Sequence, residues 1–452
     1  MLPENVKYAK ILEANAAYYG LSRLQLVESA ARAIAEQLER DFGSGKKIAI
    51  FCSPESKAAN LFAAARYLAR NNKVSLHFVG KIEQIKSAEA LRNFIILKNS
   101  FIEINCYGDS KEIPEKINTE IILECLGDER SEKLREPIKS AVKLLNKTDA
   151  AKVSIDVPCI GFKADKIYSL ATKKFEKCTV LDIGIPKEFY FFTGPGNVKF
   201  LNLRRRESHK GENGIVLIIA GSKQYHGAAI FSGRAASLFA DLVFFLTEKE
   251  NIQYVKNASP EFIVSELSKK NVEKFGALAE AILIGPGLLR SEKNKKMLEF
   301  IMKRFRNKKF VLDAGAFHML NKKLLNENCL LTPHKGEFKH LFRCMATPAK
   351  VLEMAKKHKC NILLKGPVDY ISDGKALYCN FTGNALMTAG GTGDVLAGVA
   401  AAFSTKNPML ESALAAAFLV GLAGDLIEKT EAGLNASRLI EELPKAKKLC
   451  EK

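Results

Sequence analysis

The sequence of 452 residues contains no tryptophan, only seven histidines, and no two cysteines in a C-x-x-C spacing. Its ten cysteines are scattered over the whole chain. Because zinc sites and disulfide frameworks both need cysteines at close, regular spacings, this distribution argues against either. Isolated thiols are typical of a reducing, intracellular environment, and we therefore expect a cytoplasmic protein.

Long uninterrupted apolar segments are also missing. The longest apolar run, residues 413–427, is interrupted by Gly421, Gly424 and Asp425. It falls short of the roughly 20 apolar residues that a membrane span needs. The chain starts with a polar, amphipathic segment, unlike a secretory leader. We expect no contact with a membrane.

Positive charge is abundant, with 69 Lys and Arg against 50 Asp and Glu and a net charge of +19. Clustered basic residues attract nucleic-acid phosphates. Here the basic residues form short runs spread over the whole chain, without the interleaved aromatic residues that single-strand binders use. Small anionic substrates are therefore favoured over nucleic acid as partners.

Two stretches of the chain alternate short apolar segments with helical segments, a pattern that predicts two parallel, doubly wound α/β sheets. Helical periodicity covers residues 5–40 and 58–70. Strands are expected at residues 47–52, 74–79, 120–125, 151–156, 178–183, 214–221, 281–285, 310–313, 330–332 and 362–365. The chain length and the polar stretch near residues 204–214 predict two domains, residues 1–203 and 204–452.

The most informative segment is residues 384–398, a glycine-rich loop that leads into an apolar helix expected at residues 395–403. Gly390, Gly391 and Gly393 carry no side-chain bulk, so backbone N–H groups can converge on an anion at the helix N-terminus. Asp394 lies in the first turn, where a carboxylate can take a proton from a hydroxyl held beside a phosphate. An ordinary loop with Asp394 as a capping residue is the alternative.

In the second half, polar or glycine-rich loops follow every expected strand. They contain Gly221-Ser222, Gly285–Leu288, Asp313-Ala314, Thr332–Glu337 and Lys365–Asp369. Because ligands of open α/β sheets bind outside the carboxyl ends of the strands, we expect these loops to form one site. His334 alone could equally be a loop histidine bonded to the backbone, but its position among these loops favours a ligand role.

Taken together, these motifs resemble the ADP/ATP-dependent NAD(P)H-hydrate dehydratases of the ribokinase-like superfamily. The segment ending in Gly393-Asp394 occurs across sugar and vitamin kinases of that superfamily, and its combination with Gly285–Leu288 and Thr332–Glu337 is much more specific. The resemblance implies a ribokinase-like fold. It also implies repair of NADH or NADPH that has been hydrated on the nicotinamide ring: the ring hydroxyl is phosphorylated and phosphate is then eliminated.

The resemblance also implies roles for individual residues. Asp394 would be the base for the ring hydroxyl, and Gly287 and His334 would lie with it against the hydrated dinucleotide (NADHX or NADPHX). ADP or ATP with Mg²⁺ would bind at Lys365, Gly366, Pro367, Val368, Asp369, Gly391, Thr392 and Gly393. No protein ligand of a metal is assigned. Gly315 stands where the family usually has aspartate, which could weaken the positioning of substrate or metal.

The first half resembles the NAD(P)H-hydrate epimerase domain to which such dehydratases are fused in bifunctional enzymes, which implies a Rossmann-like three-layer fold. The matching segments are residues 27–33, 126–127, 135–137, 153–158, 164–165 and 182–186. The loop at residues 52–60 departs from the family because it has lost every glycine and both asparagines. Its side chains therefore keep the backbone N–H groups from a close approach to a pyrophosphate. The epimerase-like site would comprise Lys57, Asn60, Glu124, Asp156 and Cys159.

Glu124, Cys159 and Lys57 stand where the family has other residues. The family's catalytic aspartate falls on or next to Glu124, and its serine is Cys159. The family binds K⁺ through an asparagine, an aspartate and a serine, and Lys57 takes that asparagine's position. We hypothesise that the Lys57 ammonium stands where K⁺ would sit, near Glu124. The alternative is drift, with Lys57 solvated on a decaying loop.

These observations predict a homo-oligomeric fusion with an active dehydratase half and an impaired epimerase half. Two other classes stay open. One is a kinase that phosphorylates a small hydroxylated metabolite and stops there. The other is a non-catalytic first domain that serves dimerisation, ligand binding or association with nucleic acid.

Overall fold

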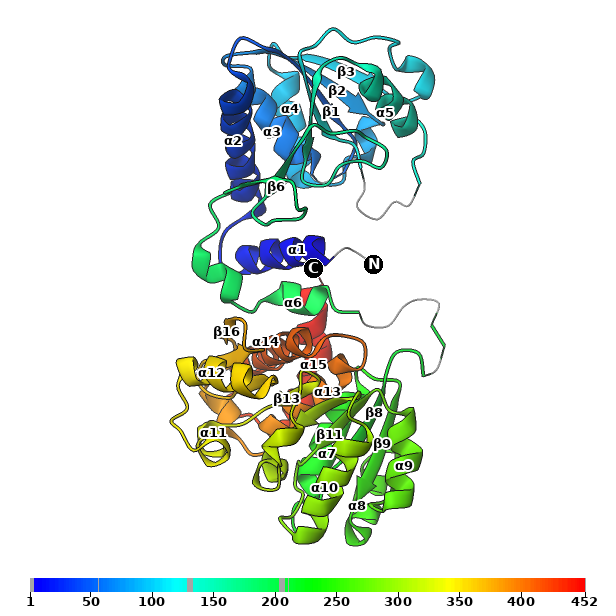
Figure 1. Ribbon diagram of the computed structural model, residues 1–452, viewed down its shortest axis with the longest axis vertical. Helices are drawn as coiled ribbons and strands as arrows, with labels where there is room; N and C mark the ends of the chain where they lie inside the picture. Colours follow the sequence, from blue (N-terminus) through cyan, green and yellow to red (C-terminus); the bar gives the residue numbers. More distant parts are fainter. Residues whose placement is uncertain (1–3, 56, 128–132, 203–207, 210, 452) are drawn as a thin grey trace. The chain divides into compact units, whose positions relative to one another are not determined.

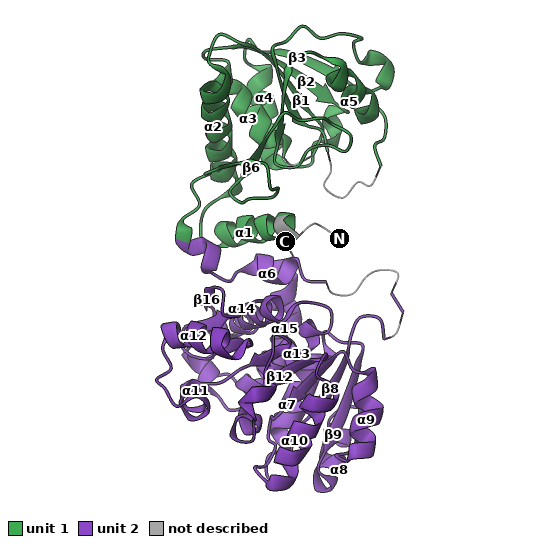
Figure 2. Ribbon diagram, in the orientation of Figure 1, with its two compact units in different colours: residues 1–187 green, residues 188–452 purple. Residues whose placement is uncertain are grey.

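The computed structural model describes residues 4–55, 57–127, 133–202, 208–209 and 211–451. The chain divides into two compact units, residues 1–187 and 188–452 (Figure 2). The predicted boundary between residues 203 and 204 lies outside the described residues. The second unit begins before it, since Thr193 N donates to Cys379 O at 3.0 Å and the short helix α6 (Pro195–Lys199) packs on α14 and α15 of that unit.

The first unit is built on a seven-stranded parallel sheet in the order β3-β2-β1-β4-β5-β6-β7 (Figure 1). Its elements are α1 (Glu4–Tyr18), α2 (Arg23–Phe42), β1 (Lys47–Cys52), α3 (Ala58–Leu68), β2 (Lys73–Val79), η1 (Ile82–Gln84), α4 (Ala88–Lys98), β3 (Glu103–Tyr107), η2 (Ser110–Glu112), β4 (Ile121–Cys125), α5 (Ile138–Lys147), β5 (Ala151–Ile155), β6 (Lys166–Leu170) and β7 (Thr179–Leu181).

Helices cover both faces of this sheet. Ala49 and Phe51 of β1 belong to the same apolar cluster as Ala141 and Leu145 of α5. Helix α3 contacts β1 and β2 and packs with α2 and α4. Because successive side chains of a strand point to opposite faces, β1 is buried from Ile48 onward between the two helical layers. The predicted three-layer, Rossmann-like arrangement is confirmed.

The second unit contains a nine-stranded sheet in the order β10-β9-β8-β11-β12-β13-β14-β15-β16, parallel except for the last two pairings. From η3 (Lys187–Phe191) at the junction and α6 onward, its elements are β8 (Ile215–Ile219), α7 (His226–Ser237), β9 (Leu242–Thr247), η4 (Lys249–Asn251), α8 (Ile252–Ala258), β10 (Phe262–Glu266), α9 (Lys269–Leu278), β11 (Ala281–Ile284), α10 (Glu292–Arg304), β12 (Lys309–Leu312), η5 (Ala314–His318), η6 (Lys322–Leu324), β13 (Cys329–Leu331), α11 (Lys335–Phe342), α12 (Pro348–His358), β14 (Asn361–Leu364), β15 (Asp369–Ser372), β16 (Leu377–Asn380), η7 (Ala385–Thr388), α13 (Thr392–Ser404), α14 (Met409–Glu428) and α15 (Ala436–Cys450).

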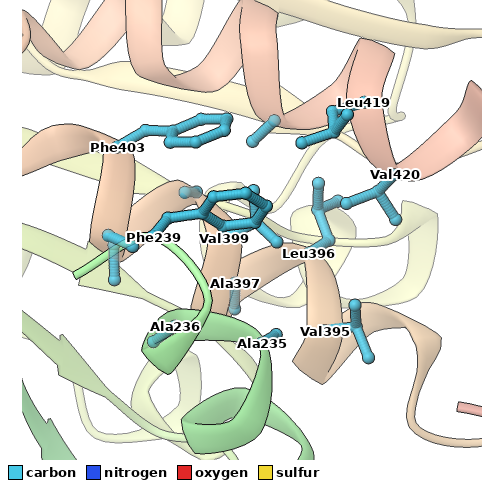
Figure 3. Packing of buried hydrophobic residues seen from close by; sticks show 14 of the residues in the cluster. Ala235, Ala236, Phe239, Val395, Leu396, Ala397, Val399, Phe403, Leu419 and Val420 are labelled. Carbon is cyan, nitrogen blue, oxygen red and sulfur yellow. The ribbon is translucent and has the colours of Figure 1, made fainter. Parts of the chain in front are cut away.

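Helix α13, which follows the glycine-rich loop, is buried between α7 and α14. Figure 3 shows Phe403 of α13, Leu419 of α14 and Ala236 of α7 in one apolar cluster. A Cβ at Gly398 would lie 2.2 Å from Ser232 O, so the glycine lets α13 approach α7 closely. This packing fixes the position of the α13 N-terminus, where the site lies.

Helix α14 is the one described helix that is long and apolar enough to cross a membrane, contrary to the expectation from its interrupted apolar run. In this structure, 72% of its most apolar window is buried. It contacts α13, α15 and α6, so it serves as a core helix of the second unit.

Candidate active site

The glycine-rich loop of the second unit is shaped by close contacts at the N-terminus of α13. Gly391 caps the helix with a φ of 92°, and a Cβ there would lie 2.6 Å from the Phe231 ring. The Thr392 hydroxyl donates to Met387 O at 2.8 Å and to Ala389 O at 3.0 Å. Thr392 therefore holds the loop together, while the first N–H groups of α13 have no carbonyl partner within the helix.

Four charged side chains act on one another at the N-terminus of this helix. Lys365 follows β14, and its Nζ donates to Asp313 Oδ1 at 2.9 Å. Thr332 Oγ1 donates to the same oxygen at 2.8 Å. Glu337 of α11 and Asp394 of α13 also act electrostatically on Lys365. One ammonium therefore faces three carboxylates.

This arrangement shifts two pKa values in a way that suits acid–base chemistry. Burial raises the pKa of Asp394 to about 7, and the charges of Asp313 and Glu337 add to the shift while Lys365 opposes it. Burial alone would lower the pKa of Lys365, but the carboxylates of Asp313, Glu337 and Asp394 outweigh it and raise that pKa. At neutral pH, Lys365 stays cationic while Asp394 is poised to take up or release a proton.

The loop from Lys365 to Asp369 is held by its own last residue. Asp369 Oδ1 accepts a hydrogen bond from Gly366 N at 3.0 Å, and its Oδ2 accepts one from Asn380 Nδ2 at 3.0 Å. Burial raises the pKa of Asp369 to about 6, against the opposing effect of these hydrogen bonds. Gly366 and Pro367 are exposed at the tip, so the backbone there is accessible to a ligand.

His334 is bonded to the backbone and still exposes its ring, and its role as a ligand stays a prediction. Its Nδ1 accepts hydrogen bonds from Gly336 N at 3.0 Å and Glu337 N at 3.3 Å, which caps α11. Its side chain is nevertheless 60% exposed, with Nε2 at 3.5 Å from Glu337 Oε2. Since Nδ1 accepts, Nε2 carries the proton of the neutral ring and is directed to the charged cluster.

Two glycines bring neighbouring loops into close contact. A Cβ at Gly287 would lie 2.4 Å from Tyr225 O, and the φ of 65° there disfavours any other residue. At Gly315, a Cβ would lie 2.2 Å from Leu288 O. The aspartate that the family usually has at position 315 would not fit this backbone, and Asp313, two residues earlier, supplies the carboxylate of the cluster.

In the first unit, the Glu124 carboxylate is completely buried and its hydrogen bonds are satisfied. Its Oε1 accepts from Leu126 N at 2.6 Å, and its Oε2 accepts from Ser154 Oγ at 2.9 Å and Cys159 N at 3.4 Å. Burial raises its pKa to about 7, although these hydrogen bonds and the charge of Lys57 oppose the shift. Glu124 thus links the ends of β4 and β5.

Lys57 forms an ion pair with Asp156, and its charge also acts on Glu124. That its ammonium stands in the place of K⁺ stays a prediction. Asp156 adopts a φ of 71°, is 3% exposed, and forms ion pairs with both Lys57 and Lys174. Burial would raise the pKa of Asp156, but the two ammonium groups outweigh it and hold the pKa below its usual value. Lys57 is only 20% exposed, so it is not a solvated residue of a decaying loop.

The residues present do not fit the K⁺ site that the resemblance implies. An alkali or alkaline-earth cation is held by several oxygen ligands. Here both oxygens of Asp156 are taken by ammonium groups, those of Glu124 by three hydrogen bonds, and Cys159 offers a thiol in place of a hydroxyl. The Lys57 and Lys174 ammonium groups supply the positive charge instead.

A cavity of about 680 Å³ lies beside these residues, at the carboxyl ends of β1, β2, β4 and β5. It is lined by Ser53, Pro54, Glu55, Glu83, Gln84, Lys86, Ser87, Leu126, Gly127, Lys133, Leu134, Arg135, Ile138, Cys159 and Ile160. Of the five positions predicted for the epimerase-like site, only Cys159 is in this lining. Lys57, Asn60, Glu124 and Asp156 are not.

The structure therefore brings together Asp394 and Lys365 in the second unit and Lys57 and Asp156 in the first. The sequence predicts that the loops of Asp313, Glu337 and Lys365 form one site, but it does not specify which side chains pair, and it does not point to Lys174. The two carboxylates could have been suspected, since each follows a strand end. Nothing in the sequence marks Lys174 as a site residue, because the pair Lys173-Lys174 looks like the other short basic runs of the chain.

Solved structures place the second unit in the ribokinase-like class. A ribokinase-like superfamily protein of Enterococcus faecalis is 26% identical, with a TM-score of 0.54, and the match covers 58% of this chain and 96% of that one. The ADP/ATP-dependent NAD(P)H-hydrate dehydratase of Bacillus subtilis, co-crystallised with ATP and Mg²⁺, is 26% identical with a TM-score of 0.51, over 57% of this chain and 98% of that one.

The family models are more specific. Residues 216–445 match the model described as NAD(P)H-hydrate dehydratase, and residues 23–181 match the YjeF-related protein N-terminus. The bifunctional NAD(P)H-hydrate repair enzyme of Archaeoglobus fulgidus is 34% identical over 97% of both chains. The ADP-dependent (S)-NAD(P)H-hydrate dehydratase of Cenarchaeum symbiosum is 40% identical over 55% of this chain and 94% of its own. The chain belongs to the family of bifunctional NAD(P)H-hydrate repair enzymes.

Proposed function

We propose that the second unit dehydrates the S epimer of NADHX or NADPHX with ADP or ATP as phosphoryl donor. The observation that carries this proposal is the position of Asp394, with a pKa near 7, in the first turn of α13 beside Lys365. The similarity to dehydratases named for this substrate and these nucleotides supports it.

In this proposal, Asp394 takes the proton from the ring hydroxyl as the hydroxyl oxygen bonds to the terminal phosphorus of the nucleotide. The bond between that phosphorus and the nucleotide's bridging oxygen breaks, and AMP or ADP leaves. The bond between the ring carbon and the phosphate oxygen then breaks, and inorganic phosphate leaves. The neighbouring ring carbon loses a proton, which restores the ring double bond. The N-terminal N–H groups of α13 and the Lys365 ammonium stabilise the negative charge that develops on the phosphoryl oxygens.

The predicted nucleotide-binding residues retain that role in the proposal. Lys365 lies at the loop, since its Nζ would be 3.2 Å from a Cβ at Gly393. The exposed backbone of Gly366 and Pro367 and the half-buried Val368 would hold the nucleotide, with Asp369 shaping the loop. Gly287 and His334 would contact the dinucleotide.

Mg²⁺, when bound, would neutralise phosphate charge during transfer. Among the residues that the structure describes, no group of three or more His, Cys, Asp and Glu could hold a metal ion. Asp313 Oδ1 is already bonded to Lys365 and Thr332. We therefore propose that Mg²⁺ is held chiefly by the phosphates of the nucleotide.

We further propose that the first unit is a poor epimerase. The support for this is that Glu124 is fully buried and that Asp156 is neutralised by two ammonium groups, so neither is ready to move a substrate proton. The experiment supplies a mixture of S and R NADHX with ADP or ATP and Mg²⁺ and follows absorbance at 340 nm. Recovery limited to the S fraction supports both parts of the proposal. No recovery with either nucleotide would favour a small-metabolite kinase.

A further inference from the structure

Three loops on the dinucleotide side of the second unit gather basic side chains that the proposed chemistry does not use. Arg290 follows Gly287 by three residues, and His318 ends η5, whose Gly315 packs against Leu288 O. His340 lies on α11, the helix that His334 caps. Because β11, β12 and β13 are adjacent in the sheet, the loops that follow them converge at one edge.

The three side chains form a chain of hydrogen bonds. Arg290 Nη2 lies 2.5 Å from His318 Nε2, and His318 Nδ1 lies 3.0 Å from His340 Nε2. A guanidinium only donates, so His318 Nε2 accepts and its Nδ1–H donates to His340. The neutral His340 ring then carries its proton on Nδ1, at the outer end of the chain. Arg290 and His340 are both exposed.

This cluster has an excess of positive charge. The charged groups that act on His318 are Arg290, His340 and His334, all of them basic, and together with partial burial they lower its pKa. Unlike Lys365, whose neighbours are carboxylates, His318 has no acidic group among those that shift its titration. An anion at the cluster would remove this repulsion, and the Arg290 guanidinium together with the remaining Nδ1–H of His340 matches the oxygens of a phosphate.

We propose that Arg290 and His340, held together by His318 between them, bind a phosphate group of the dinucleotide substrate. This inference rests on the proposed function, because it identifies the ligand from the loops assigned to the hydrated dinucleotide. Two phosphate groups share the required chemistry: the pyrophosphate that NADHX and NADPHX have in common, and the 2′-phosphate of NADPHX alone. Either would anchor the dinucleotide at a distance from the reacting ring and so contribute to substrate binding.

The first test uses inorganic pyrophosphate as the probe and the histidine ring signals in NMR spectra of the full chain. The chain has only seven histidines, and His318→Gln and His340→Gln variants assign the two signals. We expect both signals to shift saturably with pyrophosphate. The affinity should fall at least about ten-fold in Arg290→Gln, which loses a charge-assisted hydrogen bond. The matched control is Arg306→Gln, which removes an exposed arginine beyond the end of α10. The absence of a saturable shift, or an unchanged affinity in Arg290→Gln, overturns the site.

The second test compares KM for NADHX and NADPHX in Arg290→Gln and in the wild type. Equal increases for both substrates identify the pyrophosphate, whereas an increase for NADPHX alone identifies the 2′-phosphate. Unchanged KM values for both substrates contradict the proposal. If the wild type repairs neither substrate, the proposed function fails, while the pyrophosphate titration still decides whether the anion site exists.

Discussion

Each unit contains a carboxyl group whose pKa is raised to about 7, Asp394 in the second unit and Glu124 in the first. Their surroundings differ. Asp394 is half-buried at the N-terminus of a helix, beside a loop with an exposed tip. Glu124 is fully buried, and its two oxygens already accept three hydrogen bonds. A carboxyl group with a raised pKa can act as a base only if a substrate reaches that group. Of these two carboxyl groups, Asp394 meets this condition.

The balance of charge around the two sites also differs. In the second unit, one lysine faces three carboxylates, which leaves negative charge to raise the pKa of Asp394. In the first unit, two lysines meet Asp156 and hold its pKa below the usual value. The second unit thus retains a base, whereas the two lysines of the first unit neutralise the charge of Asp156.

The largest expected effect comes from Asp394→Asn, which removes the base and keeps the size of the side chain. We expect dehydration of S-NADHX to slow by about 10²–10⁴-fold. The control is Asp373→Asn in the turn between β15 and β16, which keeps its hydrogen-bonding oxygen and should leave the rate unchanged. A rate for Asp394→Asn within a few-fold of the wild type would remove Asp394 from the mechanism.

Replacing the lysine at the centre of the cluster should have the next largest effect. In Lys365→Gln, the developing phosphoryl charge loses its cation, and we expect kcat to fall by about 10²–10³-fold. The Tm of the variant should be measured alongside, because Asp313 loses its ion-pair partner. Lys375→Gln, at an exposed lysine, is the matched control. Loss of stability with an unchanged kcat would restrict Lys365 to a structural role.

The pH dependence follows from the pKa of Asp394. A base whose pKa is raised to about 7 must lose its proton before it can act, so kcat/KM for S-NADHX should rise with pH up to about 7 and level off above. Below that pH the rate should fall about ten-fold per unit. Because Lys365 lowers the pKa of Asp394, the Lys365→Gln profile should move to higher pH. An acidic limb near pH 4 in the wild type would contradict the assignment.

The smallest expected effect is on the response of the Tm to K⁺, which depends on the Lys57 and Lys174 ammonium groups of the first unit. The wild-type Tm should be the same in KCl and in choline chloride at equal concentration, because ammonium groups occupy Asp156. In Lys57→Asn, one of them is replaced by an amide oxygen, and we expect K⁺ to raise the Tm by about 2–4 °C. Lys166→Asn, which removes the partner of Asp41, should gain no such dependence.

Two results would contradict this account of the first unit. A K⁺-specific increase of the wild-type Tm would show that the unit takes the cation despite its lysines. A Lys57→Asn variant that folds but responds equally to KCl and choline chloride would show that Lys57 does not stand in for K⁺.

Much of the fold could be predicted from the sequence. Strand β1 occupies the predicted residues 47–52, because five of its six side chains are buried and the pattern is continuous. The edge strand β3 was not predicted, since only Tyr107 of its five residues is buried and it shows neither alternation nor an apolar run. The antiparallel strands β15 and β16 were also missed, because only two residues of β15 and one of β16 are buried, so neither shows the continuous burial of the predicted strands.

The site was predicted less completely, for a physical reason. The glycine-rich loop and Asp394 are contiguous in the sequence, so local chemistry identifies them. The sequence predicts that the loops of Asp313 and Lys365 share one site, but their pairing depends on the order of β12, β13 and β14 in the sheet, which the sequence does not specify. The burial of Lys174 likewise depends on a tertiary partner, Asp156, and a lysine in a basic run gives no sign of it.

The most direct test of the contrast between the units is the extent of repair of a mixture of S and R NADHX. Absorbance at 340 nm is followed with ADP or ATP and Mg²⁺ until it stops rising faster than the epimers interconvert on their own. The account predicts that fast recovery ends at the S fraction and is abolished by Asp394→Asn. Fast recovery of the whole mixture would show that the first unit is an active epimerase despite its buried Glu124 and neutralised Asp156.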